Sequence, residues 1–291
     1  MEAEKTLLTV FTPTYNRAAL LPRVYESLKR QTNKRFVWLI VDDGSTDDTK
    51  ETVRRFREEA PFPVIYEYEE NGGKMRAHNR GVSLTETEWF LCLDSDDWLT
   101  EDAVSVIYES FREMGSEKIP GQPAGLTAHK GQDSITPLYN TDFPTVSYST
   151  LYGLYLKGFR GETTLVFRTE VLRQFPFPEI PGEKYVPEDY IYDKIDGAYV
   201  LKVVPRVLTI CEVTESGYTE SLRKLKRENP TGWFLYYEQR FKITPPSLLK
   251  VKYAGYYLVY RKRAGRKLSF FSLWLLPGLG AMAALKFTGR E

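Results

Sequence analysis

Three carboxylates crowd into one short segment of this 291-residue chain. The segment DSDD places Asp94, Asp96 and Asp97 directly after the apolar run FLCL. Two like charges about 4 Å apart repel each other by roughly 1 kcal/mol in water and by about 4 kcal/mol at an intermediate dielectric. A divalent cation removes that repulsion, and oxygen ligands without a neighbouring His or Cys favour Mg²⁺ or Mn²⁺. These three residues are therefore candidate metal ligands, and the plainer alternative is a turn that caps the following helix.

The elements that position this segment alternate between strand and helix. Apolar runs predict strands at 7–11, 36–41, 64–68 and 89–94, with helices expected at 18–31, 48–60, 74–84 and 101–114. Such alternation is typical of a parallel sheet covered by helices on both faces. The predicted fold class is therefore α/β with a mostly parallel central sheet.

Polar residues follow each predicted strand, namely Pro13–Asn16, Asp42–Asp43, Asn71–Lys74 and Asp94–Asp97. Because ligands of such sheets bind beyond the carboxyl ends of the strands, we expect these residues to line one site. The sequence contains neither GxxxxGK[ST] nor GxGxxG at a strand end, which excludes a P-loop and argues against a dinucleotide dehydrogenase.

The loops carry further expectations. Asn16 is a candidate helix cap, and Ser45 with Asp48 resembles a helix-start box. From Gly115 to Asp142 the periodicity is lost, which predicts an excursion loop with an edge strand at 125–129. Further along the chain, 163–172 is expected to be a strand that runs into a short helix, 176–190 an irregular proline-rich loop, and 199–213 another strand.

Five motifs in this order resemble the family 2 glycosyltransferases with the GT-A fold: FTPTYNR, VDDGSTDDT, NGGKMRAHNRG, LDSDD and VPEDY. The resemblance covers about residues 1–215. Within the family, the chain is most similar in type to the bacterial members that build polysaccharides. It implies a Rossmann-like domain with a nucleotide-sugar half of about 1–114 and an acceptor half of about 115–215. It also implies an inverting transfer from a UDP-sugar to a hydroxyl of a glycan or lipid-linked saccharide.

The resemblance also implies which residues bind the nucleotide. They are Pro13, Tyr15, Asp42, Asp43, Asn71, Gly73, Lys74, Asp94 and Asp96. A carboxylate such as Asp43 can accept a hydrogen bond from the uracil imide, and Tyr15 can stack on the ring. DSDD corresponds to the DXD element of the family, in which Asp96 and Asp97 match the ribose and metal contacts best and Asp94 supports them. His78 is assigned no chemistry and is expected to be a packed or exposed helix residue.

VPEDY resembles the motif that supplies the general base. The resemblance implies that Asp189 takes the proton of the acceptor hydroxyl and that Glu188 orients it or binds the acceptor. Such a base contributes typically about 10²–10⁴-fold to the rate. Without the resemblance, both carboxylates simply favour a helix N-terminus. The implied cofactor, Mg²⁺ or Mn²⁺, neutralises charge that grows on the leaving diphosphate.

Residues 216–291 are expected to form a helical extension that is basic and apolar. Between Arg223 and Lys267 the sequence has 13 Lys and Arg residues against two acidic ones. The uncharged stretch 268–285 would reach about 27 Å as a straight helix, marginal for a bilayer core, and Pro277 is expected to break it. Attachment to the membrane surface, which the basic flank favours, stays open beside spanning and packing on protein. No recognition motif for nucleic acid accompanies the basic run.

The length suits one large domain or a domain with an appendage. Two cysteines, Cys92 and Cys211, cannot build a disulfide framework, and the N-terminal residues do not resemble a signal peptide. The expected location is therefore the cytoplasm, peripherally on the inner face of the cell membrane. Two other functions are weighed: a sugar-nucleotide pyrophosphorylase, which would need a Gly-rich basic loop after the first strand, and a non-catalytic nucleotide- or glycan-binding module.

Overall fold

The computed structural model describes residues 6–212, 218–268 and 273–287. The chain divides into two compact units. Unit 1 comprises Met1–Pro176 and Ile191–Val213, and unit 2 comprises Phe177–Tyr190 and Thr214–Glu291. This division differs from the predicted one, 1–215 and 216–291, because the segment that carries VPEDY belongs to unit 2.

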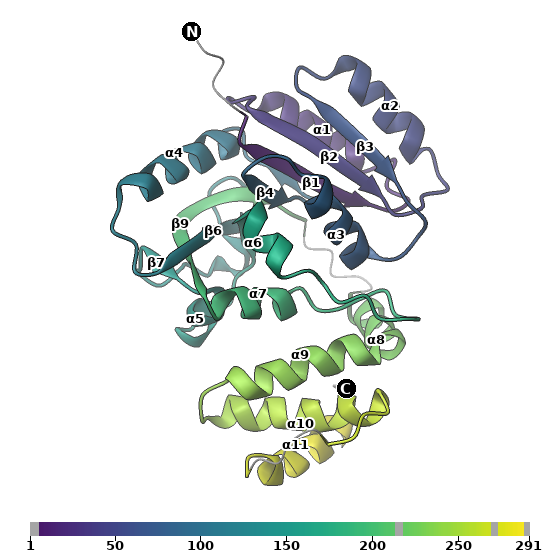
Figure 1. The fold of residues 1–291 in the computed structure, drawn as a ribbon, viewed down its shortest axis with the longest axis vertical. Helices are drawn as coiled ribbons and strands as arrows, with labels where there is room; N and C mark the ends of the chain where they lie inside the picture. The colour runs from purple at the N-terminus through teal and green to yellow at the C-terminus, as the bar shows by residue number, and fades with distance from the viewer. Residues whose placement is uncertain (1–5, 213–217, 269–272, 288–291) are drawn as a thin grey trace. The chain divides into compact units, whose positions relative to one another are not determined.

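Unit 1 is built on a mixed sheet (Figure 1). Its strands are β1 Leu8–Thr14, β2 Phe36–Asp42, β3 Val64–Tyr68, β4 Trp89–Cys92, β5 Trp98–Leu99, β6 Gln122–Gly131, β7 Tyr148–Ser149, β8 Thr163–Arg168 and β9 Tyr199–Ile210. Their order is β3-β2-β1-β4-β8-β6-β9-β5, with β7 paired to β9. The four N-terminal strands β1–β4 are parallel to one another, as is β6 to β9, whereas β8 is antiparallel to both β4 and β6. The predicted α/β class with a mostly parallel sheet is confirmed.

The helices are α1 Leu21–Arg30, α2 Thr49–Glu59, α3 Lys74–Leu84, α4 Ala103–Ser116, α5 Leu151–Leu156, α6 Thr169–Gln174, α7 Asp189–Asp196, α8 Tyr218–Glu228, α9 Pro230–Ile243, α10 Leu248–Arg263 and α11 Leu275–Phe287, with a 3₁₀ turn at Leu138–Asn140. Those of the N-terminal half cover both faces of the sheet, so β1 is buried along its whole length. This explains why the strands appear in the sequence as continuous apolar runs rather than as alternating ones.

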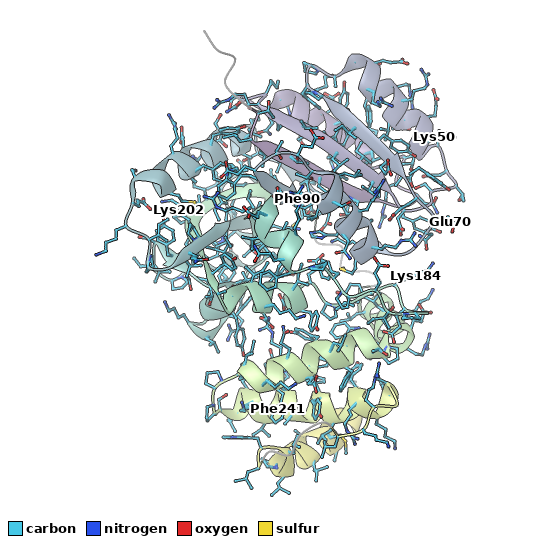
Figure 2. All side chains as sticks on the ribbon, in the orientation of Figure 1. Lys50, Glu70, Phe90, Lys184, Lys202 and Phe241 are labelled. Carbon is cyan, nitrogen blue, oxygen red and sulfur yellow. The ribbon has the colours of Figure 1, made fainter. Side chains whose placement is uncertain are left out.

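Opposite faces of the sheet hold different groups of side chains. On one face, Val24 of α1 and Val53 of α2 join Trp38 in the main core cluster. On the other face, the ring of His78 in α3 lies 5.3 Å from the ring of Phe90, which is labelled in Figure 2. His78 is therefore a packed residue of the sheet–helix interface, as predicted.

Two predicted helix caps are wrong. Asn16 precedes α1 by several residues, has a φ of 53° and donates its backbone N–H to the Oγ of Ser45. Asp48 stands at the N-cap of α2 without a side-chain cap bond. The Oδ2 of Asp47 instead accepts from the backbone N–H of Ala18 at 3.0 Å. The polar residues thus tie the first two loops to each other instead of capping their own helices.

The predicted excursion loop between residues 115 and 142 is also wrong. The strand expected at 125–129 is present as part of β6, but β6 lies inside the sheet between β8 and β9 and is not an edge strand. Gly125 has a φ of 156°, and a Cβ there would lie 1.9 Å from the carbonyl oxygen of Val166. The register of β6 against β9 shifts around His129 and Lys130. Such irregularities redirect side chains at the end of a strand, and here they act next to Lys130.

Unit 2 consists of helices α8–α11 and the segment 177–190. An aromatic cluster fills the α9–α10 hairpin, where the rings of Phe241 and Tyr257 lie 5.7 Å apart (Figure 2). Glu183 accepts from the backbone N–H groups of Thr231 and Gly232 at 2.8 Å each, which caps the start of α9. The segment that carries VPEDY is therefore anchored on α9.

The predicted break at Pro277 is wrong. α11 begins at Leu275, so Pro277 lies in the first helical turn, where its missing N–H costs no hydrogen bond. Within residues 6–212, 218–268 and 273–287, no helix combines the length and the apolar character needed to cross a bilayer.

Candidate active site

A pocket of about 330 Å³ opens in unit 1 at the carboxyl ends of β1, β2 and β4. It is lined by Pro13, Thr14, Tyr15, Arg17, Asp43, Lys74, Asp94, Ser95 and Asp96. Six of the nine predicted nucleotide-binding residues are among them, and they come from four separate motifs. The sheet therefore brings together side chains that lie up to about eighty residues apart in the sequence.

The carboxylate of Asp43 joins the ends of two motifs. Its Oδ2 accepts from Asn71 Nδ2 at 3.0 Å and from the backbone N–H of Gly73 at 2.8 Å. Its Oδ1 accepts from the backbone N–H of Gly72 at 2.6 Å. Gly73 has a φ of 96°, which favours glycine. Asn71 and Gly73 do not line the pocket, but they hold the carboxylate that does.

Asp42 lies behind the pocket and is 1% exposed. Its Oδ2 accepts from the hydroxyl of Tyr66 at 2.7 Å, and its Oδ1 accepts from the backbone N–H of Ser45 at 2.8 Å. Asp42 therefore supports the turn after β2, and the structure does not place it on the pocket wall.

Two lysines neutralise the carboxylates of DSDD. Lys74 Nζ lies 2.6 Å from Asp94 Oδ1. Lys130 Nζ lies 2.6 Å from Asp97 Oδ2 and 3.7 Å from Asp94 Oδ2. Asp96 is exposed and forms no ion pair with any residue that the structure describes. The two lysines thus pair with Asp94 and Asp97, and among the described residues Asp96 is the DSDD carboxylate without an ion pair.

The lysines also set the protonation of the cluster. Burial alone would raise the pKa of the Asp94 carboxyl, but Lys74 and Lys130 outweigh it and hold that pKa below its usual value. Burial raises the pKa of Asp97 to about 6 against the attraction of Lys130, and the charge of Asp94 adds to the rise. At neutral pH, Asp94 is therefore firmly ionised, whereas Asp97 is close to the range in which it takes up a proton.

The arrangement fits a divalent cation only in part. Mg²⁺ in proteins typically takes one or two carboxylates and completes its shell with phosphate oxygens and water. Asp96 and Asp94 on the pocket wall meet this description, whereas Asp97 is withdrawn into its pair with Lys130. Among the described residues, no group of three or more His, Cys, Asp or Glu side chains is arranged to hold a metal. The donor set therefore suits an ion whose remaining ligands come from the bound substrate.

Sequence reasoning missed three cations of this site. Arg17 lines the pocket and lies within the quoted motif FTPTYNR. Arg23 Nη2 donates to the carbonyl of Asp96 at 2.8 Å and stacks its guanidinium 4.1 Å from the ring of Trp98, which fixes the DSDD turn. Lys130 lies in a region without periodicity, and no pattern in the sequence marks it.

Asp189 lies in unit 2, at the first residue of α7. Its Oδ2 lies 3.0 Å from Nη2 of Arg240, a buried residue of α9. Burial raises the pKa of the Asp189 carboxyl; Arg240 opposes the rise and Glu188 adds to it, while a hydrogen bond from Tyr236 lowers it slightly. The carboxylate is thus held by one cation and has its pKa above the usual value.

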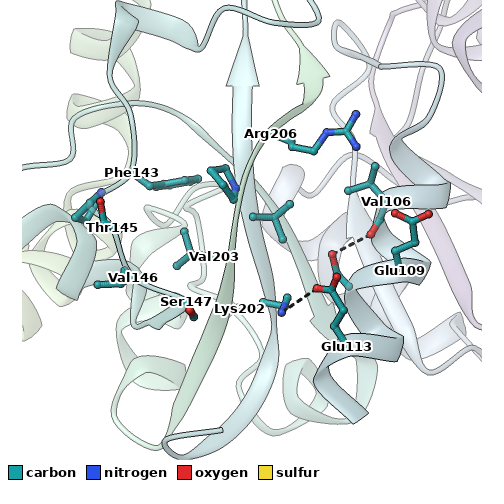
Figure 3. Close-up of a pocket in the computed structure, with 14 residues that line it drawn as sticks. Val106, Glu109, Glu113, Phe143, Thr145, Val146, Ser147, Lys202, Val203 and Arg206 are labelled. Carbon is teal, nitrogen blue, oxygen red and sulfur yellow. Dashed lines mark hydrogen bonds and ion pairs between the residues drawn. The ribbon is translucent and has the colours of Figure 1, made fainter. Parts of the chain in front are cut away.

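A second, larger pocket of about 610 Å³ lies between α4, residues 143–147 and β9 (Figure 3). Both of its basic residues are ion-paired, and Lys202 Nζ lies 3.1 Å from Glu113 Oε2. Arg206 forms an ion pair with Asp102 at 2.5 Å. None of the five motifs contributes a residue to this pocket. The smaller pocket is therefore the candidate active site.

Comparison with protein families agrees with this choice. Residues 9–120 match the model of Glycosyl transferase family 2. That stretch contains every residue of the smaller pocket and four of the five motifs. The part of the chain that carries the pocket is thus similar to glycosyl transferase family 2, the family that the motifs resemble.

A curated relative matches the same part of the chain. Glycosyltransferase GlyG of Streptococcus pneumoniae is 30% identical over 115 residues, which cover 40% of this chain and 38% of GlyG. The chain therefore spans less than half the length of this relative.

Solved structures are similar in fold to nearly the whole chain, including both units. S. aureus TarS 1–349 in complex with UDP-GlcNAc gives a TM-score of 0.62 at 18% identity and covers 94% of this chain and 80% of its own. Mannosyltransferase PcManGT from Pyrobaculum calidifontis, in complex with GDP-Man and Mn²⁺, gives a TM-score of 0.58 at 19% identity, with coverages of 98% and 81%. The fold is the predicted GT-A fold.

Proposed function

We propose that this protein is an inverting glycosyltransferase that moves a sugar from a nucleoside diphosphate sugar to a hydroxyl of a glycan or lipid-linked saccharide. UDP-sugar is the expected donor. One observation carries the proposal: a single pocket joins a tyrosine and a hydrogen-bonded carboxylate to a lysine and the acidic turn of DSDD, within a stretch that is similar to glycosyl transferase family 2.

Different residues of the pocket are proposed to bind different parts of the donor. Tyr15 is 48% exposed, so its ring is available to stack on the base. Asp43 accepts from the imide N–H of uracil, its orientation set by the glycine turn. Lys74 supplies a point charge to the diphosphate, which then shares the lysine with Asp94.

Asp96, with Asp94 beside it, would hold a divalent cation, Mg²⁺ or Mn²⁺. When bound, the ion would supply positive charge to the diphosphate as the glycosidic bond to phosphate breaks. The mannosyltransferase with the same fold is a complex with Mn²⁺, which supports this assignment. Asp97 is left out of the proposed ligand set because it does not line the pocket and its carboxylate is buried against Lys130.

Asp189 is the proposed general base. It takes the proton of the acceptor hydroxyl as the hydroxyl oxygen forms a bond to the anomeric carbon. The bond from that carbon to the phosphate oxygen breaks on the opposite side, and its electron pair leaves with the diphosphate, so the configuration inverts. Arg240 keeps the base oriented, and Glu188 binds the acceptor or orients the base.

The remaining parts receive proposed roles as well. Residues 1–114 form the nucleotide-sugar half, and 115–215 contribute the acceptor half. Residues 216–291 attach the enzyme peripherally to the inner face of the cell membrane. The charge of the extension supports this role, since the sequence has eleven Lys and Arg residues and no Asp or Glu between Gln239 and Arg290.

A donor panel tests the proposal. The full chain is incubated with Mn²⁺ and UDP-Glc, UDP-Gal, UDP-GlcNAc, UDP-GalNAc or GDP-Man, and release of the nucleoside diphosphate is measured. We expect one UDP-sugar to be cleaved and Asp96→Asn to lower metal-dependent UDP affinity by about tenfold or more in calorimetry. Glu70→Gln, an exposed carboxylate outside the pocket, is the matched control. If the protein binds UDP tightly but releases no nucleoside diphosphate from any donor, it is a nucleotide-binding module and not a glycosyltransferase.

A further inference from the structure

α11 packs on α10 through small residues. A Cβ on Gly278 would lie 2.7 Å from the Cβ of Ala254, and a Cβ on Gly255 would lie 2.9 Å from the Cβ of Ala281. Leu275 on the same side is 6% exposed. The backbones of the two helices therefore approach closely, and this contact fixes which side of α11 points outward.

The outward side of α11 is apolar and exposed. Leu276 is 60% exposed, Leu279 is 50% exposed, and Leu273 just before the helix is 74% exposed. Successive residues turn by about 100° in a helix, so Leu276, Leu279 and Ala283 share one side. No charged residue occurs between Leu268 and Leu285. We call Leu273, Leu276, Leu279 and Ala283 the leucine stripe.

A positive segment precedes the leucine stripe directly. Residues 261–267 have the sequence RKRAGRK, in which Lys262, Arg263, Arg266 and Lys267 are exposed. No acidic residue follows in the sequence before Glu291 to compensate these charges. An apolar stripe with a flank of one sign attracts a partner that is negative at its surface and apolar just beneath it.

We propose that the leucine stripe and the basic segment 261–267 form one contact surface for an anionic phospholipid bilayer. The leucines enter the boundary between headgroups and acyl chains, while the basic segment faces the lipid phosphates. The proposal names the lipid partner and the contacting face of the membrane attachment proposed above, and it rests on that attachment. α11 has 13 residues, about 20 Å of helix, so it lies on the bilayer and does not cross it.

A second copy of the chain is a poorer occupant of this surface. Protein interfaces of ordinary stability bury about 1,200–2,000 Å², which a stripe along one short helix does not supply. A two-fold symmetric contact would also bring two basic segments toward each other. A negative lipid surface removes that repulsion, and its fluid interior accepts single leucines that project from a convex helix.

Vesicle sedimentation of the full chain tests the proposal without a donor or acceptor. The vesicles contain phosphatidylcholine alone or phosphatidylcholine with phosphatidylglycerol. We expect binding to the anionic vesicles, weakened about tenfold to a hundredfold in L276S/L279S and about fivefold for each charge removed in R266Q/K267Q. Ile135→Ser changes an apolar residue of unit 1 that is 84% exposed, and it should bind like the wild type.

Two outcomes would overturn the proposal. One is binding to anionic vesicles that is the same in the wild type and in both double variants. The other is a wild-type dimer, measured by light scattering, that dissociates in L276S/L279S. Donor cleavage in the absence of vesicles reports separately on the proposed activity, and the L276S/L279S variant should retain it. A failure of the lipid contact and a failure of the glycosyltransferase assignment are therefore distinguishable.

Discussion

The acidic turn of unit 1 and the VPEDY segment of unit 2 each hold a half-buried carboxylate, and the pKa values of the two carboxyls shift in opposite directions. Asp94 has two lysines at hand, and they depress its pKa even though burial acts against them. Asp189 has one arginine and an acidic neighbour, Glu188, and burial keeps its pKa raised. Both carboxylates are ion-paired, so an ion pair by itself does not decide the direction of the shift.

The difference teaches what each carboxylate is suited to do. A carboxylate that stays ionised at all working pH values serves electrostatics, such as binding a cation or orienting a lysine. A carboxylate whose pKa is raised exchanges protons more readily near neutral pH, which is the property of a general base. The three predictions that follow separate these two roles.

The largest effect is expected for Asp189→Asn. The amide cannot take the proton of the acceptor, so the transfer rate should fall by about 10²–10⁴-fold. UDP affinity in calorimetry should stay at the wild-type value, because the nucleotide pocket belongs to unit 1. Glu179→Gln, an exposed carboxylate of the same loop, is the control. Full transfer activity in a folded Asp189→Asn protein would remove the base assignment.

The second prediction concerns the stability of the acidic turn. Lys130→Met leaves Asp97 buried without its nearest cation, which should lower the free energy of unfolding by about 3–5 kcal/mol at pH 8 in urea titrations. The double variant K130M/D97N should recover most of that loss, because it removes both charges.

The pH dependence of that loss sharpens the prediction. The folded-state pKa of Asp97 is about 6 in the wild type, and removal of Lys130 raises it further. The folded Lys130→Met protein therefore binds a proton more readily than the unfolded chain, and its stability falls as the pH rises through that pKa. The loss should thus be smaller at pH 5 than at pH 8, and equal losses at both values would contradict the charge argument.

The smallest effect is expected for Arg240→Met. Arg240 lowers the pKa of Asp189, so its removal raises that pKa and reduces the ionised fraction of the base at low pH. The acidic limb of log kcat/KM against pH should move upward by about one unit, which is about tenfold in rate below the limb. Arg240→Lys keeps the charge and should return the limb toward its wild-type position. An unchanged limb in Arg240→Met would show that the arginine serves the fold alone.

The first 114 residues could be predicted from the sequence because their signals are local. The strands are short, mostly apolar runs followed by polar residues, and β1, β2, β3 and β4 were all expected close to their observed bounds, whereas the two-residue strand β5 was not. The rule that ligands meet the carboxyl ends of parallel strands then gathered Tyr15, Asp43 and Asp96 correctly into one pocket.

Other parts of the fold and site could not be predicted because they depend on distant partners. A strand was expected at 125–129, but the full length of β6 and its place between β8 and β9 depend on pairing with those two strands. Lys130 at the end of β6 meets Asp97 across 33 residues, and Arg240 meets Asp189 across an even longer stretch of chain. No periodicity or motif marks such pairs, since only the tertiary structure places them within reach.

The three N–H groups on Asp43 have a consequence for recognition. They fasten the glycine turn at residues 71–73 to the end of β2 while unit 1 folds, before any ligand arrives. The entropic cost of ordering this turn is therefore incurred during folding and not during ligand binding. A site that is already ordered loses less entropy when it binds, and its affinity is higher for that reason. If the proposed function holds, selectivity for the nucleotide base would follow from the shape of this preformed turn.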